Sequence, residues 1–432
     1  MPRAPDAHSR PPGPSRRRRF LLTLAVSLAA AAAVLLLLPS EPVPEVRRVG
    51  GCRVLALSGT PEEMGHAHGT ALRDEVRYVV RTVVGDTGEA NLVAAERMAR
   101  ALPERYRREL AALADAAGVD ERCLIYLQLF GDVARAMPWD FQEEDDAAAQ
   151  CTAYAAFGPA TATGELVAGR NMDYFDRGVS KRAAIIIDYR PDGYHRFVTA
   201  TWAGIINGWT LMNEKGLVTS NNTAETGENS LDGVSTCFLL RMVAEECASV
   251  DEATALLART PRACGTAQLV AGGSPPDAAV LEFDAEAVGV RRAERGLVVA
   301  ANGHRLPGGR FHFPPPEGRD GYGTGRYGTL NRLLHAHHGR IDRSMNFTAA
   351  EGVPLRGINL QSILLFPGDL SLRVAMGHVP ACDGPFEALR MAPGGVEPWP
   401  DAPALVVPEA PTPAGGEDGP ATPLEDLLKV FE

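Results

Sequence analysis

The sequence lacks the short motifs that mark several common enzyme classes. It contains no Gly-x-Ser-x-Gly sequence, which argues against a Ser-His-Asp hydrolase. The glycine-rich stretch 321–326 lacks the Gly-Lys-Ser/Thr ending of a phosphate-binding loop. The cysteines show no Cys-x-x-Cys or histidine-rich ligand spacing, so we expect no zinc or iron–sulfur site and no other cofactor.

Basic residues are scarce outside the N-terminus. Residues 1–39 hold six arginines and one aspartate, so the rest of the chain carries 37 basic and 53 acidic side chains, a net charge of −16. A body this acidic argues against binding to nucleic acid, or to an anionic membrane through a broad basic face. With 432 residues, 45% apolar and 22% charged, the composition is typical of a globular protein with a real core.

One long hydrophobic run occurs, from Phe20 to Leu38, directly after Arg16–Arg19. Its 19 residues come close to the ~20 that span a bilayer and exceed the usual signal-peptide core. We therefore expect a basic cytoplasmic segment at residues 1–19 and a signal anchor at residues 20–38, with a cleaved signal peptide as the alternative. The rest of the chain would then be membrane-anchored or secreted, outside the cytoplasm.

The seven cysteines are an odd number, so an oxidising compartment leaves at least one of them unpaired or in an intermolecular bond. We predict that Cys151 is the free thiol. If the Gln150–Cys151 bond breaks, Cys151 becomes an N-terminal residue with a thiol and a free α-amine. An α-amine titrates near pH ~8, against ~10.4 for lysine, so it can act as general base toward its own thiol. The alternative for a single cysteine at a strand start is a small buried hydrophobe.

Arg170 and Asp173 lie three residues apart at the end of the strand that should pair with the Cys151 strand. A cation near a thiolate lowers the pKa of the thiol, and a carboxylate near the α-amine orients that amine. The alternative is a surface ion pair at a turn, which contributes little. A papain-like pairing of a cysteine with His304 or His312 is a further alternative, but neither histidine has a local motif.

Three segments together resemble the cysteine N-terminal nucleophile hydrolases: Cys151-Thr152, Arg170–Asp173 and Met212–Leu217. Within these, the chain is similar to the peptidase C45 group, typified by acyl-coenzyme A:6-aminopenicillanic acid acyltransferase. The glycine-spaced helix opening at Gly59–Gly69 also resembles C45 precursors, and the likeness extends from about residue 54 to about residue 384.

The resemblance implies a role for each matching residue. Cys151 is the nucleophile and, through its freed amine, the base, while Arg170 and Asp173 shape its surroundings. Asn222 matches an asparagine that helps to form the oxyanion hole. A slip of one residue would select Asn221 instead, because adjacent strand residues face opposite sides.

Two further residues are implied by later segments. Residues 300–304 resemble the segment that supplies a second active-site asparagine, which here is Asn302. Residues 325–327 resemble a Ser-Arg-Phe-like segment that supplies a late arginine, which here is Arg326.

The predicted elements divide the chain into a helical part and a strand-rich part. Helical patterns cover residues 59–84, 91–117 and 120–137, with a predicted capping box at Thr60–Glu63 and a predicted cap at Asp120. We assign residues 39–150 to a propeptide or α-chain. Three hairpins, at 152–171, 184–200 and 205–221, predict one antiparallel sheet, and helices return at 234–247 and 249–259. The class is α+β, and the resemblance implies a four-layer αββα sandwich with two antiparallel sheets in the catalytic chain, residues 151–391. Residues 392–432 read as a Pro/Gly/acidic tail.

The resulting interpretation is a self-processing, exported amidohydrolase. It would cleave the linear C–N bond of a small N-acyl amide, or accept an acyl thioester, through an acyl-Cys151 thioester, with transfer of the acyl group to an amine as a second outcome. Its two chains would come from one precursor, and its membrane contact would come from the N-terminal apolar segment. The alternative is a catalytically inactive, surface-anchored binding protein on the same fold.

Overall fold

The computed structural model describes residues 44–137, 150–306 and 324–409. The predicted anchor at residues 20–38 and the residues after 409 lie outside these ranges, and no helix within them is long and apolar enough to span a bilayer. The predicted helical part is present. It comprises α2 (Pro61–Ala71), α3 (Arg73–Val79), the π-helical turn η1 (Val80–Val84), α4 (Glu89–Ala99), α5 (Glu104–Ala117) and α6 (Glu121–Ala136).

Local capping signals set the starts of these helices. The Thr60 side chain accepts from the Glu63 backbone N–H, and the Glu63 carboxylate accepts from the Thr60 N–H, which completes the predicted capping box. Asp120 caps α6 by accepting from the Arg122 N–H at 2.8 Å. Glycine at position 65 lets α2 approach α5 closely, because a Cβ there would lie 2.2 Å from a carbonyl oxygen of α5.

The described strands form two sheets. The nine-stranded sheet has the order β1 (Arg47–Val49), β2 (Cys52–Gly59), β5 (Ala184–Pro191), β6 (Phe197–Trp202), β7 (Thr210–Asn213), β8 (Val218–Ser220), β9 (Thr266–Gly272), β10 (Asp277–Phe283) and β11 (Val288–Arg292). The seven-stranded sheet has the order β12 (Leu297–Ala301), β3 (Gln150–Ala156), β4 (Val167–Asp173), β13 (Asn359–Phe366), β14 (Ser371–Met376), β15 (Glu387–Ala392) and β16 (Gly395–Pro398).

The remaining elements are helices and short 3-10 turns. The helices are α7 (Ser180–Ala183), α8 (Thr236–Glu246), α9 (Val250–Arg259) and α10 (Thr324–Ala336). The 3-10 turns are η4 (Gly158–Ala160), η5 (Phe347–Ala349), η6 (Arg356–Ile358) and η7 (Ala381–Asp383).

The structure corrects three expectations about the sheets. All three hairpins form, but β3–β4 lies in the seven-stranded sheet whereas β5–β6 and β7–β8 lie in the nine-stranded one. The nine-stranded sheet is also not purely antiparallel, because β2 pairs with β5 in parallel from Val54↔Ile186 to Gly59↔Pro191. A parallel pair needs a long crossover, and the helical part supplies it. The seven-stranded sheet also extends to Pro398, past residue 392 where the tail was expected to begin.

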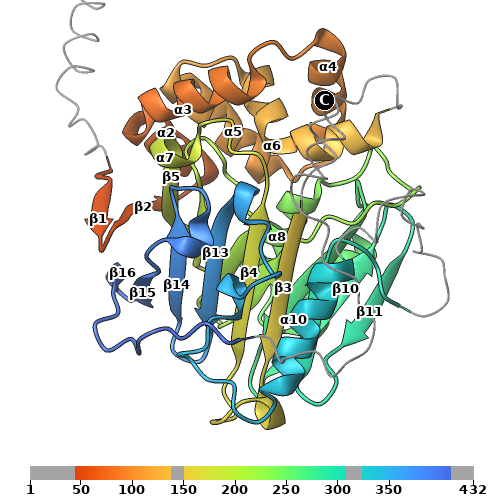
Figure 1. Cartoon of the computed structure of the whole chain (residues 1–432). Coiled ribbons are helices and arrows are strands. Elements are labelled where there is room, and N and C mark those ends of the chain that lie inside the picture. The colour runs from red at the N-terminus through yellow and green to blue at the C-terminus, as the bar shows by residue number, and fades with distance from the viewer. Residues whose placement is uncertain (1–43, 138–149, 307–323, 410–432) are drawn as a thin grey trace, which may run out of the picture. The chain divides into compact units, whose positions relative to one another are not determined.

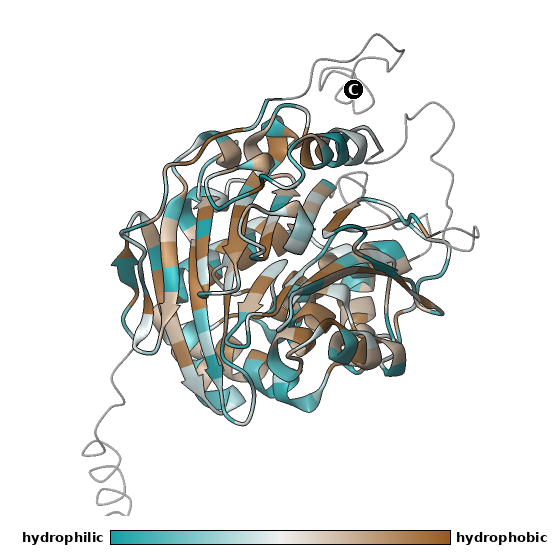
Figure 2. Cartoon of the chain, turned by 90° about the horizontal axis from the view of Figure 1, so that it is seen from below, coloured by the Kyte–Doolittle hydropathy of each residue, from teal (hydrophilic) through white to brown (hydrophobic). Residues whose placement is uncertain are grey.

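The two sheets pack face to face, with helices against both outer faces. One apolar cluster contains residues of both sheets, among them Ala155 of β3 and Leu269 of β9. A second joins the other face of the nine-stranded sheet to α2–α6, α8 and α9, and a third joins the seven-stranded sheet to α10. Figure 1 shows α2–α6 gathered at one end of the strands, and Figure 2 shows apolar residues running along both sheets.

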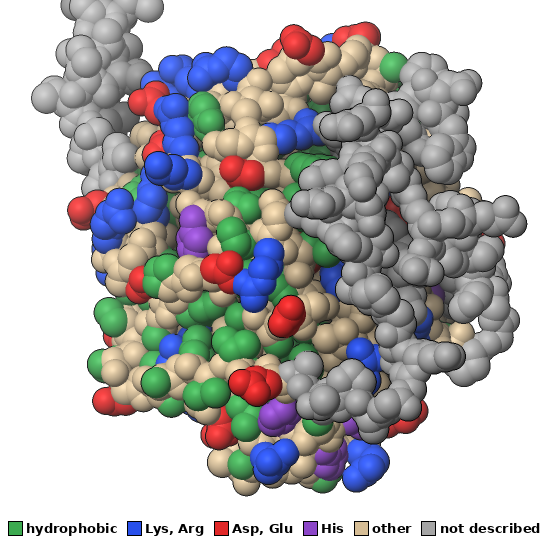
Figure 3. Space-filling view, in the orientation of Figure 1, with side chains coloured by type: hydrophobic (Ala, Val, Ile, Leu, Met, Phe, Trp, Pro, Cys, Tyr) green, Lys and Arg blue, Asp and Glu red, His purple; other side chains and the backbone are tan. Residues whose placement is uncertain are grey.

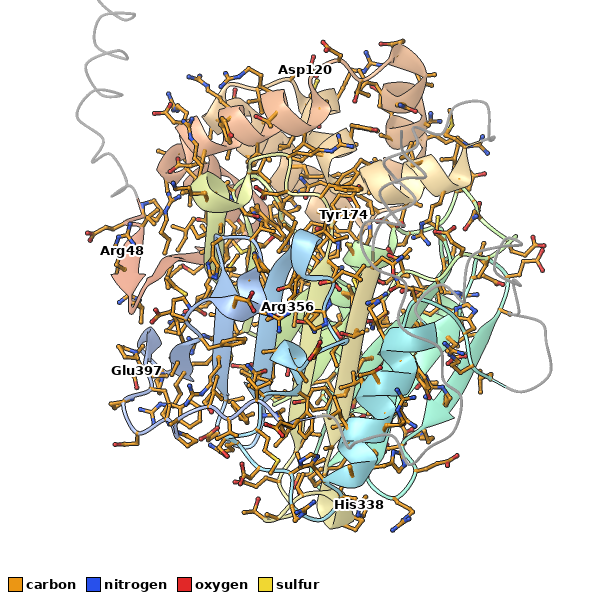
Figure 4. All side chains as sticks on the ribbon, in the orientation of Figure 1. Arg48, Asp120, Tyr174, His338, Arg356 and Glu397 are labelled. Atoms are coloured by element: carbon orange, nitrogen blue, oxygen red, sulfur yellow. The ribbon has the colours of Figure 1, made fainter. Side chains whose placement is uncertain are left out.

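On the face drawn in Figure 3, basic side chains are interspersed with acidic ones where the described residues are visible. The helical part and the first residues of β3 meet at one end of the sandwich. Tyr174, which follows β4, lies at that junction in Figure 4. The candidate site is located there.

Candidate active site

The β3–β4 hairpin sets the positions of Cys151, Arg170 and Asp173. Cys151 pairs with Met172 and Gln150 pairs with Asp173 in an antiparallel register. Cys151 and Arg170 therefore occupy the same face of the sheet, one pair apart diagonally, where long side chains reach each other. Asp173 occupies the opposite face at the end of β4.

Arg170 holds the thiol directly. Its Nη2 donates to Cys151 Sγ at 3.1 Å. Nη2 and Nε also donate to the Asn221 carbonyl at 3.0 and 3.2 Å, and Nη1 donates to Thr210 Oγ1 at 3.3 Å. Arg170 is only 1% exposed, so neighbouring residues surround its side chain and hold it in place. The sequence prediction that Arg170 lies beside the thiol is therefore matched by the geometry.

Asn302 holds the backbone nitrogen of Cys151. Its Oδ1 accepts from the Cys151 N–H at 2.6 Å, and its Nδ2 donates to the Thr223 carbonyl at 2.7 Å. This nitrogen belongs to the Gln150–Cys151 peptide bond, which the sequence predicts to break. The same contact would hold the α-amine after cleavage.

Arg326, in the first turn of α10, links the other groups. Its Nη1 donates to the Cys151 carbonyl at 3.1 Å and approaches Asp173 Oδ2 at 3.5 Å. Its Nη2 donates to Asn302 Oδ1 at 3.0 Å and to the side-chain oxygen of Gln150. The structure thus brings five of the six predicted residues together: Cys151, Arg170, Asp173, Asn302 and Arg326.

Burial dominates the titration of the two acidic groups. It raises the pKa of the Cys151 thiol, and the Arg170 and Arg326 guanidinium groups oppose this only in part. Arg170 thus lowers the pKa of the thiol, as the sequence predicts, but the burial of Cys151, which is 3% exposed, outweighs this effect. Burial also raises the pKa of Asp173, against the opposing charge of Arg326 and the hydrogen bond from Asn359.

The sixth predicted residue, Asn222, lies outside the pocket that contains Cys151. Its Nδ2 donates to the Ala267 carbonyl at 3.0 Å. Asn221 instead lines the pocket with Cys151, and its Oδ1 accepts from the Thr266 hydroxyl. The structure therefore moves the candidate oxyanion donor from Asn222 to Asn221, the alternative that a slip of one residue selects.

The Cys151 pocket has a polar and an apolar side. Its polar lining comes from α6, the loop after β8 and the start of α8, with Asp132, Asn221 and Thr236 among the residues. A neighbouring cavity of about 500 Å³, including the part open to solvent, is lined almost entirely by apolar side chains. Four residues line both spaces: Phe130, Met172, Tyr174 and Trp209.

Sequence reasoning missed three contributors to the site. Asn359, at the start of β13, donates to Asp173 Oδ1 at 2.8 Å, and the backbone N–H of Leu355 donates to Oδ2 at 3.0 Å. The Thr266 hydroxyl orients Asn221. Asn359 and Thr266 are single polar residues in otherwise ordinary segments, and Leu355 contributes only its backbone N–H, so no local pattern marks any of the three. Residues of α6 also line the pocket, and only the apolar face of this helix could have indicated that in the sequence.

Within the part of the chain that the structure describes, no hydrogen bond joins a histidine to the Cys151 thiol. His304 Nε2 lies 2.8 Å from the Thr266 carbonyl, and burial lowers the pKa of its ring. His312 lies outside the described residues. No group of three or more His, Cys, Asp or Glu side chains within those residues is arranged to hold a metal ion.

Comparison with known proteins gives one family match. Residues 160–305 match the family described as acyl-coenzyme A:6-aminopenicillanic acid acyl-transferase. The matched segment begins after Cys151 and contains Arg170, Asp173 and Asn302. The family resemblance predicted from the sequence is thereby confirmed.

Individual relatives are distant. The chain is 23% identical over 249 residues to protein dcd1A of Dictyostelium discoideum, covering 49% of this chain and 54% of that protein. It spans about half the length of the curated relatives that it matches. Among solved structures, a Caenorhabditis elegans N-acylethanolamine-hydrolyzing acid amidase ortholog aligns at 19% identity with a TM-score of 0.37, covering 50% of this chain and 93% of that one. A conjugated bile acid hydrolase mutant from Clostridium perfringens aligns at 15% identity with a TM-score of 0.39, covering 59% and 98%.

Proposed function

We propose that this chain, a member of the acyl-coenzyme A:6-aminopenicillanic acid acyl-transferase family through residues 160–305, is a self-processing cysteine amidohydrolase. It releases Cys151 as an N-terminal residue and then cleaves the C–N bond of N-acyl amides. The observation that carries the proposal is the pair of contacts on Cys151. Arg170 holds its sulfur at 3.1 Å, and Asn302 holds its nitrogen at 2.6 Å.

Self-cleavage begins with attack of Cys151 Sγ on the carbonyl carbon of Gln150. The C–N bond breaks, the thiol proton passes to the departing Cys151 nitrogen, and Gln150 is left as a thioester on Sγ. Water then hydrolyses this thioester, which yields a carboxylate on Gln150 and restores the thiol. Asn302 remains bound to the nitrogen throughout, so the new α-amine stays beside its own thiol.

Substrate turnover repeats this chemistry with an external amide. The α-amine takes the thiol proton as Sγ attacks the acyl carbonyl, and it returns the proton to the departing amine. The Asn221 amide donates to the oxyanion that develops on the carbonyl oxygen. Water then attacks the acyl-Cys151 thioester and releases the acid. Capture by an amine in place of water would give acyl transfer, but hydrolysis is the primary activity that we propose, because acyl-coenzyme A donors are scarce outside the cytoplasm.

The acyl group that we propose is apolar. The cavity beside the Cys151 pocket is lined by side chains such as Leu127, Phe130 and Trp202, and the two spaces share Trp209. Burying an aliphatic or aromatic acyl group there gains about 25 cal/mol for each Å² of apolar surface removed from water. The polar lining around Asp132 and Thr236 is then left for the amine part of the substrate.

We further propose that the two chains stay associated after cleavage. The helical chain contributes β2 to the nine-stranded sheet and Phe130 to the pocket wall. Its Glu109 forms a buried two-point ion pair with Arg241 of α8, at 2.6 and 3.1 Å. A dissociated Cys151 chain would expose these surfaces to water. The location of this catalytic body outside the cytoplasm is part of the same proposal and rests on residues 16–38 alone.

The test is a series of N-acyl amides with acyl chains of increasing length and a fluorescent amine. Wild type should release the amine, and Cys151→Ser, which keeps the size of the side chain, should release it at least 10²-fold more slowly because the hydroxyl is the weaker nucleophile. Leu127→Trp, which fills the apolar cavity, should raise KM for long acyl groups and leave short ones unchanged. Equal amine release by wild type and Cys151→Ser would reject the proposed nucleophile.

A further inference from the structure

Gln150 is held by its side chain as well as by its strand. Its Oε1 accepts from Arg326 Nη2, the same nitrogen that donates to Asn302 Oδ1. Asn302 Oδ1 in turn accepts from the Cys151 N–H. Arg326 and Asn302 therefore contact both sides of the Gln150–Cys151 bond together. Arg326 binds the side chain of Gln150 on the acyl side, and Asn302 binds the Cys151 nitrogen on the other side.

The four terminal N–H groups of Arg326 all have acceptors in this arrangement. Nη1 faces the Cys151 carbonyl and Asp173 Oδ2, and Nη2 faces Asn302 Oδ1 and Gln150 Oε1. Arg326 is 8% exposed, so a lost acceptor is not simply replaced by bulk water. Leaving a charged, buried donor unpaired is costly. The carboxamide of Gln150 is thus part of what keeps Arg326, and with it the Cys151 peptide unit, in position.

We propose that Gln150 is the recognition residue for self-cleavage and that Arg326 recognises it by binding its side-chain oxygen. This inference rests on the proposed function, because it concerns the self-cleavage step. Arg170 fixes the attacking sulfur, Asn302 fixes the departing nitrogen, and the Gln150–Arg326 contact fixes the acyl side of the same bond. Holding all three raises the fraction of time that Sγ spends aligned with the Gln150 carbonyl carbon.

Cleavage removes the Gln150–Arg326 contact. The effect of this contact on self-cleavage can therefore be measured separately from substrate turnover. Gln150 becomes the last residue of the helical chain, whereas Cys151, Asn302 and Arg326 remain in the active site. A Gln150 variant should therefore change the rate at which mature protein forms without changing the activity of each mature site. One N–H of Arg326 Nη2 also loses its acceptor at that point and becomes available to an oxygen of the substrate or to water.

The experiment measures the conversion of full-length precursor to its two chains by intact mass over time. Gln150→Met keeps the length of the side chain but removes the acceptor, and it should slow cleavage about 10- to 100-fold, the effect of losing a hydrogen bond to a charged group. Gln150→Glu keeps both length and acceptor and should cleave within about threefold of wild type. Amide hydrolysis by the matured fraction, per site titrated with a thiol reagent, should be unchanged in both variants.

A double-mutant cycle with Arg326→Lys guards against a general effect on folding. If the contact acts as proposed, Gln150→Met should cost much less in the Arg326→Lys background than in wild type. Cleavage of Gln150→Met at the wild-type rate would overturn the inference while leaving the proposed function intact, and so would equal costs in the two backgrounds. Failure of wild type itself to cleave would instead refute the self-processing function.

Discussion

Removing the charge of Arg170 should make the Cys151 thiol much less reactive. The guanidinium donates to Sγ at 3.1 Å and is almost fully buried. A unit charge about 4 Å from a thiolate contributes about 4 kcal/mol at an effective dielectric constant of about 20, which corresponds to roughly 3 pKa units. Burial already raises the pKa of this thiol, and Arg170 is the largest opposing influence. The thiolate fraction at a given pH below the pKa should therefore fall by about 10²- to 10³-fold in Arg170→Gln.

The assay is the pH dependence of alkylation of Cys151 by iodoacetamide, followed on the Cys151 peptide by mass spectrometry. Intact mass distinguishes cleaved from uncleaved protein, so wild type and variant can be compared in the same state. The midpoint of the alkylation profile should move to higher pH in Arg170→Gln. Arg170→Lys retains a charge and should shift it less. Thr210→Val removes the 3.3 Å partner of Nη1 and a donor to Gln361 but no charge, and it should hardly shift the midpoint. Coincident profiles for Arg170→Gln and wild type would refute the reasoning.

Two further predictions separate function from stability. Asn221→Ala should lower kcat about 10²- to 10³-fold with little change in KM. Asn222→Ala should chiefly lower the unfolding midpoint, because the Asn222 amide donates to the Ala267 carbonyl. The reverse pattern would return the oxyanion role to Asn222. Burial raises the pKa of Glu109 to about 7, so the folded state binds its proton more tightly than the unfolded state. Stability should therefore fall as pH rises from about 4.5 to about 7, and Glu109→Gln should lose this slope in urea unfolding; an unchanged slope would contradict the assignment.

Local signals in the sequence predicted local structure well. The capping box at Thr60 and the Asp120 cap depend on residues two to three positions away, and the turn residues define each hairpin within about 20 residues. The hairpin also placed Arg170 near Cys151, since antiparallel pairing follows directly from the turn.

Long-range pairing was not predictable in the same way. The partner of β2 is β5, and the whole helical part lies between them, so nothing local indicates the parallel pairing. The alternation rule also could not choose between Asn221 and Asn222. β8 ends at Ser220, so the two asparagines lie in a loop where adjacent side chains need not alternate.

The contacts of Arg326 show the same limit at the site itself. The family resemblance selected this residue, but its contact with Gln150 depends on how α10 packs against the start of β3. No α10 pattern was evident in the sequence, because the helix contains two glycines and follows a glycine-rich stretch. Side chains that converge from distant segments can be assigned together only when the fold is known.

The measurement that tests the central claim most directly is intact-mass spectrometry of the purified protein beside its Cys151→Ala variant. The account predicts a fragment that begins at Cys151 in the wild type and a single uncleaved chain in the variant. One uncleaved chain in both would contradict it, because Cys151 would then have no α-amine to act as its base.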